Sequence, residues 1–175
     1  MRFDIETARR LGAAGVVLGL LRPDATIDRD RTAALVELAR PMSVTFHKAF
    51  DQTRDPEQAL DTLIALGVDR VLTSGGRPSA LEGIDTLKRL VDRARGRIAI
   101  LAGGRLSADN LPTILARTGV REVHLGSAAS RALPGSMTTA PHDGSDVSWS
   151  GVDSDTVRRI VELVAGLKPG RNESQ

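Results

Sequence analysis

The sequence alternates short apolar runs with longer amphipathic segments, and this alternation constrains the fold more than any other feature. A glycine followed by valine marks three of the junctions, at Gly15, Gly67 and Gly119, which are 52 residues apart. Half of that interval is about the length of one strand with its helix, as expected where parallel strands are joined by crossover helices. The pattern therefore predicts an α/β domain with a parallel sheet.

Turn and cap residues divide the chain into five expected strands with helices between them. The strands are expected over residues 16–21, 43–47, 69–73, 97–102 and 121–125. The helices are expected over residues 2–13, 28–39, 55–67 and 79–96, from 107 and from 153 or 154. Helix starts are marked by Asp28, by Asp55 before a proline, and by the capping box of Ser79 and Glu82, whose helix would bury Leu81.

The segments between these elements set the domain boundaries. Residues 134–152 are rich in serine, glycine and threonine, so a long mobile loop is expected there. Residues 1–168 are predicted to form one domain, and residues 169–175 a disordered tail.

Composition excludes several classes of protein. The net charge of +2 and the 2% of aromatic residues argue against nucleic-acid binding, which needs basic patches and stacking side chains. The chain has no cysteine, so disulfides and thiolate metal sites cannot form within it. No apolar run is long enough to predict a membrane span, and the first residues lack the apolar core of a signal peptide. We therefore expect a cytoplasmic protein.

The stretch from Ser43 to Asp51 reads as a short strand that runs into a polar loop. Alternation places Val44 and Phe46 on one face and Thr45 and His47 on the other. His47 would then lie at the carboxyl end of a parallel strand, where α/β folds carry their chemistry. Its intrinsic pKa near neutrality makes it a candidate for acid–base catalysis.

Glycine-rich turns follow three successive strands and predict a site for a small anion, since glycine lets a backbone approach a ligand closely. Alternatively, these glycines only permit tight turns, and the polar side chains beside them are satisfied by their neighbours. The candidate anion-binding residues are Thr45, Thr73, Ser74, Gly75, Gly103, Gly104, Gly126 and Ser127.

A transition-metal site is a further possibility. His47 and His124 could approach each other across the predicted pocket, with Glu122 nearby, and two histidines with one carboxylate can hold such a metal. Hydrogen bonding is the other role open to these histidines.

The motifs together resemble the CutC family, which is named for copper homeostasis. The resemblance rests above all on residues 44–51 and 70–76, and also on 15–28, 102–104 and 122–124; it covers about residues 2–130 and the last helix. It implies a cytoplasmic, oligomeric (β/α)8 barrel that binds and traffics copper. The alternatives are a lyase- or isomerase-like barrel enzyme acting on a small phosphorylated metabolite, or an inactive fragment.

The chain departs from the family pattern at its beginning. It resembles strands four to eight of the family's barrel, without the early strands that carry cysteines, so either a truncated product or a start assigned too far downstream is expected. Copper(I) prefers sulfur ligands, and only Met1, Met42 and Met137 offer sulfur here. Five strands cannot close a barrel, so we expect two open sheet edges and association with a second copy through them.

Overall fold

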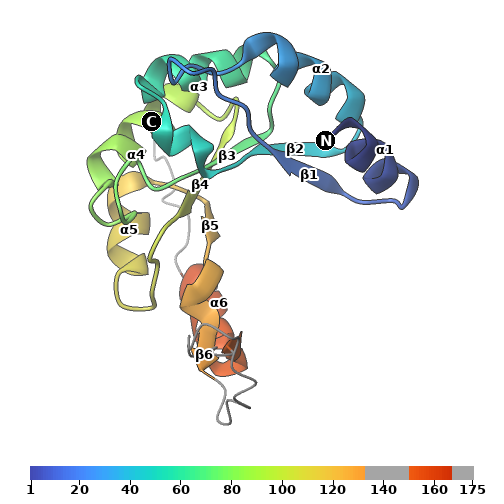
Figure 1. The fold of residues 1–175 in the computed structure, drawn as a ribbon. Helices are drawn as coiled ribbons and strands as arrows, with labels where there is room; N and C mark the ends of the chain where they lie inside the picture. Colours follow the sequence, from blue (N-terminus) through green and yellow to red (C-terminus); the bar gives the residue numbers. More distant parts are fainter. Residues whose placement is uncertain (133–149, 167–175) are drawn as a thin grey trace, which may run out of the picture.

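The computed structural model describes residues 1–132 and 150–166, and its centre is one sheet of five parallel strands in sequential order. The strands are β1 (Gly15–Leu18), β2 (Ser43–Phe46), β3 (Arg70–Thr73), β4 (Ala99–Gly103) and β5 (Glu122–His124). Strand and helix alternate along the chain, as the spacing of glycines predicts. The sheet curves in the manner of a barrel wall and forms a partial (β/α)8 barrel (Figure 1).

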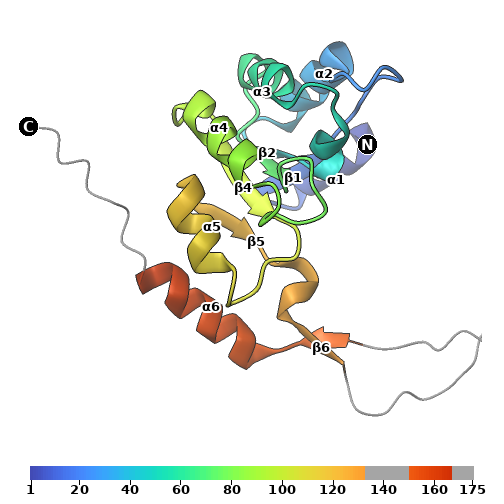
Figure 2. The same ribbon diagram turned by 90° about the vertical axis from the view of Figure 1, so that its left-hand side faces the viewer.

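Helices cover one side of this sheet (Figure 1). They are α1 (Arg2–Arg10), α2 (Arg29–Ala39), α3 (Pro56–Ala65), α4 (Ile84–Ala94) and α5 (Leu111–Thr118), with the short 3-10 helix η1 (Lys48–Gln52) after β2. Beyond β5 lie a second 3-10 helix, η2 (Gly126–Ala129), a strand pair of β6 (Ser130–Ala132) and β7 (Ser150–Val152), and α6 (Ser154–Gly166), which runs past the end of the sheet (Figure 2). Among the described residues, no helix has the length and apolar character needed to cross a membrane.

Alternation along the strands separates two faces of the sheet. The face toward the helices, called the helix face, is closed, and its residues include Val44, Phe46, Val71 and Ala102, all fully buried. The concave face, called the lumen face, is partly open to solvent. It carries Val17, Ser43, Thr45, His47, Arg70, Leu72, Leu101, Gly103, Glu122 and His124. The predicted division of the stretch around His47 into two faces is therefore confirmed.

The structure corrects the predicted start of the fourth helix. Ser79 and Glu82 do form their side-chain pair, but α4 begins only at Ile84, and Leu81 is 44% exposed rather than buried. The helix starts late because Gly83 packs so closely on Ser74 that a Cβ there would lie 1.9 Å from its carbonyl oxygen.

Two segments predicted as loops contain regular structure. The polar stretch after His47 forms η1, and residues 150–152 of the expected mobile loop form β7. The rest of that loop and the predicted tail lie outside the described residues.

Candidate functional site

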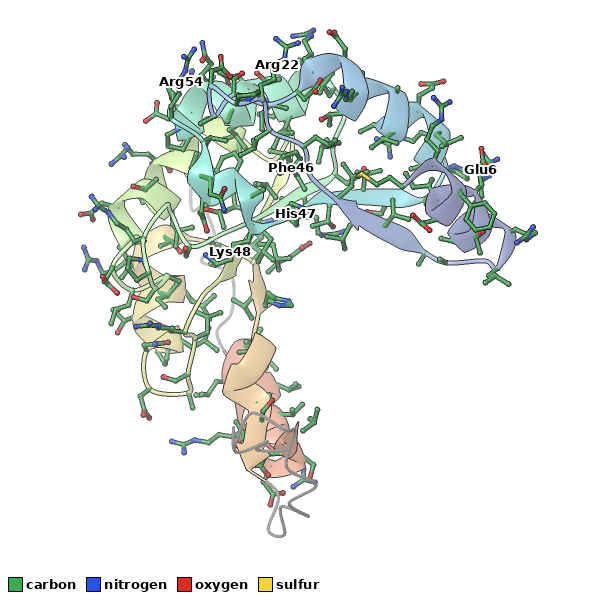
Figure 3. All side chains as sticks on the ribbon, in the orientation of Figure 1. Glu6, Arg22, Phe46, His47, Lys48 and Arg54 are labelled. Atoms are coloured by element: carbon green, nitrogen blue, oxygen red, sulfur yellow. The ribbon has the colours of Figure 1, made fainter. Side chains whose placement is uncertain are left out.

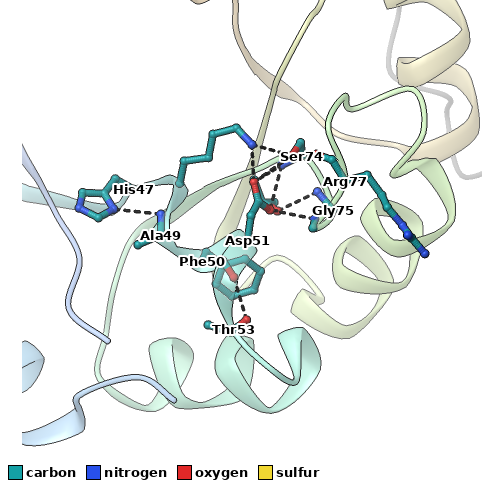
Figure 4. A network of polar contacts seen from close by, with 11 residues as sticks. His47, Ala49, Phe50, Asp51, Thr53, Ser74, Gly75 and Arg77 are labelled. Carbon is teal, nitrogen blue, oxygen red and sulfur yellow. Dashed lines mark hydrogen bonds and ion pairs between the residues drawn. The ribbon is translucent and has the colours of Figure 1, made fainter. Parts of the chain in front are cut away.

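His47 lies at the carboxyl end of β2, on the lumen face, as predicted. Its backbone is still extended, and its N–H donates to the carbonyl of Leu18 on β1 at 2.8 Å. The N–H of Ala49 donates to His47 Nδ1 at 3.1 Å, so the imidazole caps η1 (Figure 4). On its other side the ring contacts Gly19, where a Cβ would come within 2.6 Å of Nδ1. These contacts fix both the position and the rotation of the ring.

Asp51 is the centre of the polar network at the end of β2 and β3 (Figure 4). The backbone N–H groups of Ser74 and Gly76 donate to its carboxylate at 3.1 and 2.9 Å. The hydroxyl of Thr73 donates to Oδ1, and Ser74 Oγ lies 2.9 Å from Oδ2. Lys48 Nζ completes the set at 2.5 Å from Oδ2. We call this group of five residues the Asp51 network.

The electrostatics of this network favour a charged carboxylate. The Asp51 side chain is only 12% exposed, and burial alone would raise its pKa. The hydrogen bonds from Lys48, Thr73 and the two backbone N–H groups outweigh that effect and lower the pKa of Asp51. Lys48 Nζ also donates to Ser74 Oγ at 2.6 Å. The network is therefore an ionised, internally satisfied cluster.

The network occupies the backbone donors that the sequence assigns to an external anion. The N–H of Ser74 is bonded to Asp51, and the N–H of Gly75 to Thr73 Oγ1 at 2.9 Å. Gly75 and Gly104 are also packed against their surroundings: an added Cβ would lie 2.6 Å from the carbonyl oxygen of Gly83 and 2.9 Å from Ser74 Cβ, respectively. In the structure, the anion held by this turn is the chain's own carboxylate.

The remaining candidates for anion binding lie on other parts of the rim. Thr45 is on the lumen face, two residues before His47. Gly103 lies beneath Leu72, whose Cδ1 would be 2.7 Å from an added Cβ. Gly126 adopts a φ of +44° beside the imidazole of His124, and Ser127 follows it in η2. In the described part of the chain, none of these four residues donates a hydrogen bond to the Asp51 carboxylate.

The structure separates the predicted metal ligands. His47 follows β2 and His124 ends β5, with β3 and β4 between them. Arg70 donates to both carboxylate oxygens of Glu122, at 2.8 and 3.2 Å, and this hydrogen bonding lowers the pKa of Glu122. Within residues 1–132 and 150–166, no three His, Asp or Glu side chains are grouped so that they could hold a metal ion.

The methionines do not supply the missing ligands. Met42 is 5% exposed and belongs to the core under the helix face, Met1 is exposed at the start of α1, and Met137 lies outside the described residues. The described residues thus do not form a copper cage on their own.

Sequence reasoning missed Lys48, Asp51 and Gly19. Lys48 and Asp51 are three residues apart in the motif that singles out His47, and this spacing puts both on one side of a helical turn. The spacing of these two residues could therefore have indicated their ion pair from the sequence alone. The contact between Gly19 and His47 depends on the register of β1 against β2, which pairs Leu18 with Phe46 and is not visible in the sequence.

Comparison with known proteins gives consistent results. The model of the CutC family matches residues 1–129. A "family protein CutC" of Vibrio campbellii is 51% identical over 140 residues, covering 79% of this chain and 56% of the relative. The "copper homeostasis protein cutC homolog" of Mus musculus is 47% identical over 131 residues, covering 75% of this chain and 48% of that protein. The chain thus spans about half the length of these relatives.

Solved structures agree in fold. The crystal structure of the putative copper homeostasis protein CutC from Streptococcus agalactiae superposes with a TM-score of 0.67 at 34% identity, covering 70% of this chain and 60% of that one. A structure titled "Native KDPGal structure" gives a TM-score of 0.57 at 16% identity, covering 94% of this chain and 66% of the other, and shows a shared fold alone.

Proposed function

The chain belongs to the CutC family, and from that membership we propose that it acts in copper homeostasis in the cytoplasm, where it binds copper ion and passes it on. The name of the mouse relative, a copper homeostasis protein cutC homolog, supports the role in copper homeostasis. The absence of cysteine fits a reducing compartment.

His124 carries the proposal for copper binding. It ends β5, and among the described residues its imidazole has no hydrogen-bond partner, so a ring nitrogen is open to an incoming ion. His47 ranks second, because a metal on Nε2 would move the proton to Nδ1 and remove the hydrogen bond from Ala49. Glu122 ranks third, because binding copper would cost its two bonds with Arg70.

Competition titration of copper(I) against a chromophoric chelator tests this order. We expect His124→Ala to weaken copper binding most, His47→Ala less, and Glu122→Gln least. His142→Ala, which changes the remaining histidine of the chain, is the matched control. Equal affinity in the wild type and in all four variants would refute copper binding at this rim.

A second candidate function is binding or turnover of a small phosphorylated or carboxylated metabolite, as in a lyase- or isomerase-like barrel enzyme. The observation that favours it is the position of His47, which is rigidly held on the lumen face at the carboxyl end of a parallel strand. Isothermal titration with inorganic phosphate and with acetate tests it, and heat signals no greater than those of buffer dilution would count against it.

We also propose that residues 1–168 form one domain that associates as a homo-oligomer. Among the described residues, β1 and β5 each have one edge without a neighbouring strand. Such edges offer unpaired backbone groups to a second copy. Light scattering across a dilution series tests the proposal, since a concentration-independent monomer would contradict it.

A further inference from the structure

The hydrogen bond from Ala49 determines which nitrogen of His47 carries a proton. The N–H of Ala49 points at Nδ1 at 3.1 Å, so Nδ1 accepts and has no hydrogen of its own. A neutral imidazole carries one proton, which must then be on Nε2. The neutral ring therefore presents an N–H donor at Nε2 instead of a lone pair.

Gly19 holds the ring in this orientation. The ring lies so close to Gly19 Cα that an added Cβ would be 2.6 Å from Cε1 and Nδ1 and 3.1 Å from Nε2. Gly19 is not among the glycines with a positive φ, so its backbone conformation is one that any residue can adopt. The close approach of the imidazole is the reason that the position excludes a side chain.

The surroundings of His47 differ from those of Asp51. Figure 4 shows the imidazole turned away from the Asp51 network, although both begin in the same short segment. Next to His47 on the lumen face lie Thr45 and Leu72, both half-buried, and Leu72 covers Gly103. Thr45 has no side-chain hydrogen-bond partner among the described residues. A ligand beside His47 would meet the N–H group at Nε2, the hydroxyl of Thr45 and the apolar side chain of Leu72.

We propose that His47 is a fixed Nε2–H hydrogen-bond donor for an oxygen atom of a small oxyanion, either a phosphate or a carboxylate, and that Gly19 is its positioning residue. The inference deepens the second candidate function and rests on it. It also gives the reason that His47 ranks below His124 as a copper ligand, since copper needs a lone pair at the nitrogen that carries the proton. The recognised oxyanion does not enter the glycine turn, whose donors are bonded to Asp51 and Thr73.

The tautomer can be observed directly in the wild-type chain. Long-range ¹H–¹⁵N spectra of the imidazoles near pH 8 distinguish Nε2–H from Nδ1–H rings. We expect His47 to be Nε2–H, and addition of inorganic phosphate or acetate to shift its Nε2 signal. An Nδ1–H ring overturns the inference without affecting the second candidate function. An Nε2–H ring with no shift from either anion overturns both.

Replacements at His47 separate donation from metal binding. In His47→Gln the side-chain amide can donate from near the position of Nε2, whereas His47→Ala removes the donor. We expect the affinity for the binding anion to fall about tenfold in His47→Ala and by no more than about threefold in His47→Gln. Comparing phosphate with acetate identifies which oxyanion is preferred. Equal losses in both variants would contradict a donor role.

Gly19→Ala tests the positioning role with a readout that general destabilisation does not move. The added methyl group overlaps the ring, so we expect the Nε2–H tautomer to give way to a mixture and anion affinity to fall with it. Gly166→Ala is the matched control, because an added Cβ there meets no atom within 4 Å. A pure Nε2–H ring in folded Gly19→Ala would overturn the assignment of Gly19.

Discussion

The two faces of the five-stranded sheet are built from alternate residues of the same strands, yet their packing differs. On the helix face, Phe46 and Val71 are fully buried against helices. Figure 3 shows Phe46 on the side of the sheet that the helices cover. On the lumen face, Val17 is 66% exposed, and Leu72 and Leu101 are half-buried. The hydrophobic free energy that stabilises the sheet is therefore concentrated on the helix face. The lumen face is left to polar side chains that a ligand or a second copy can contact.

Charged groups also differ in burial between Asp51 and the lumen face. Asp51, which bonds to the helix-face residue Thr73, is nearly buried, and all its donors are in place. The ion pair of Arg70 and Glu122 on the lumen face has side chains that are 32% and 37% exposed. In the first arrangement, hydrogen bonds compensate a nearly buried charge for the water it has lost, whereas the charges of the second remain screened by solvent. Substitutions on the two faces should therefore have very different consequences.

The largest effect is expected from the core of the helix face. Phe46→Ala removes a fully buried ring and leaves a cavity, so the free energy of unfolding should fall by about 4 kcal/mol. Val17→Ala on the lumen face should change it by less than about 0.5 kcal/mol. Urea denaturation followed by circular dichroism measures both. Similar losses in the two variants would show that the lumen face is buried in solution.

Asp51→Asn should have the next largest effect. The amide keeps one acceptor, but its NH2 group must replace one oxygen. At Oδ2 it faces the donors of Ser74 and Lys48, and at Oδ1 it faces those of Thr73 and Gly76. We expect the free energy of unfolding to fall by about 3 kcal/mol. Asp92→Asn, which changes an exposed carboxylate paired with Lys88, is the control and should cost less than about 0.5 kcal/mol.

The same carboxylate predicts a dependence of stability on pH. The pKa of Asp51 is lowered on folding, so its contribution is complete above the unfolded value of about 3.9 and is lost as the pH falls through the folded pKa. Wild-type stability should therefore drop below about pH 4 more steeply than that of Asp51→Asn. Parallel curves for the two proteins between pH 5 and pH 2, obtained by thermal unfolding, would contradict the assignment.

Local sequence patterns were enough to predict the two faces of the sheet. Contacts that depend on how distant segments pack could not be predicted from them. Alternation in Val44 to His47 predicts which side chains are buried, because it depends only on neighbours along the chain. The partner of Asp51 is a turn more than 20 residues away, and the sequence offers no local sign that Ser74 and Gly76 donate to it. The part of the predicted anion site at Ser74 and Gly75 was therefore placed on donors that the fold already uses.

Helix starts show the same limit. Asp55 accepts from the N–H groups of Glu57 and Gln58, so this cap was predicted correctly from local sequence. Ser79 and Glu82 form the predicted pair as well, yet the chain between them and Ile84 is held as a turn by the packing of Gly83 on Ser74. A local pattern forms in both places, and tertiary packing decides whether a helix continues from it.

The ion pair of Arg70 and Glu122 should contribute much less than Asp51. A double-mutant cycle with Arg70→Met and Glu122→Gln is expected to give a coupling of about 0.5–1 kcal/mol, because both side chains are about one-third exposed. The coupling should shrink between 0.05 and 1 M NaCl, roughly as screening shortens the Debye length. A salt-independent coupling above about 2 kcal/mol would mean that the lumen is closed around the pair.

The smallest effect on folding is expected from Val17→Thr, which keeps the shape of the side chain and exchanges a methyl group for a hydroxyl. Because Val17 is 66% exposed, the free energy of unfolding of the monomer should change by less than about 0.5 kcal/mol. If a second copy covers the lumen face at β1, the hydroxyl becomes buried, and the dissociation constant measured by light scattering should rise about fivefold.

Val152→Thr is the matched control for this comparison, since Val152 is 78% exposed on β7, outside the five-stranded sheet. It should leave both the unfolding curve and the dissociation constant unchanged. Equal weakening of association by the two variants would place the contact between copies elsewhere than the β1 edge. A large loss of monomer stability in Val17→Thr would show instead that the lumen face is packed within a single chain, and the contrast between the two faces of the sheet would then be wrong.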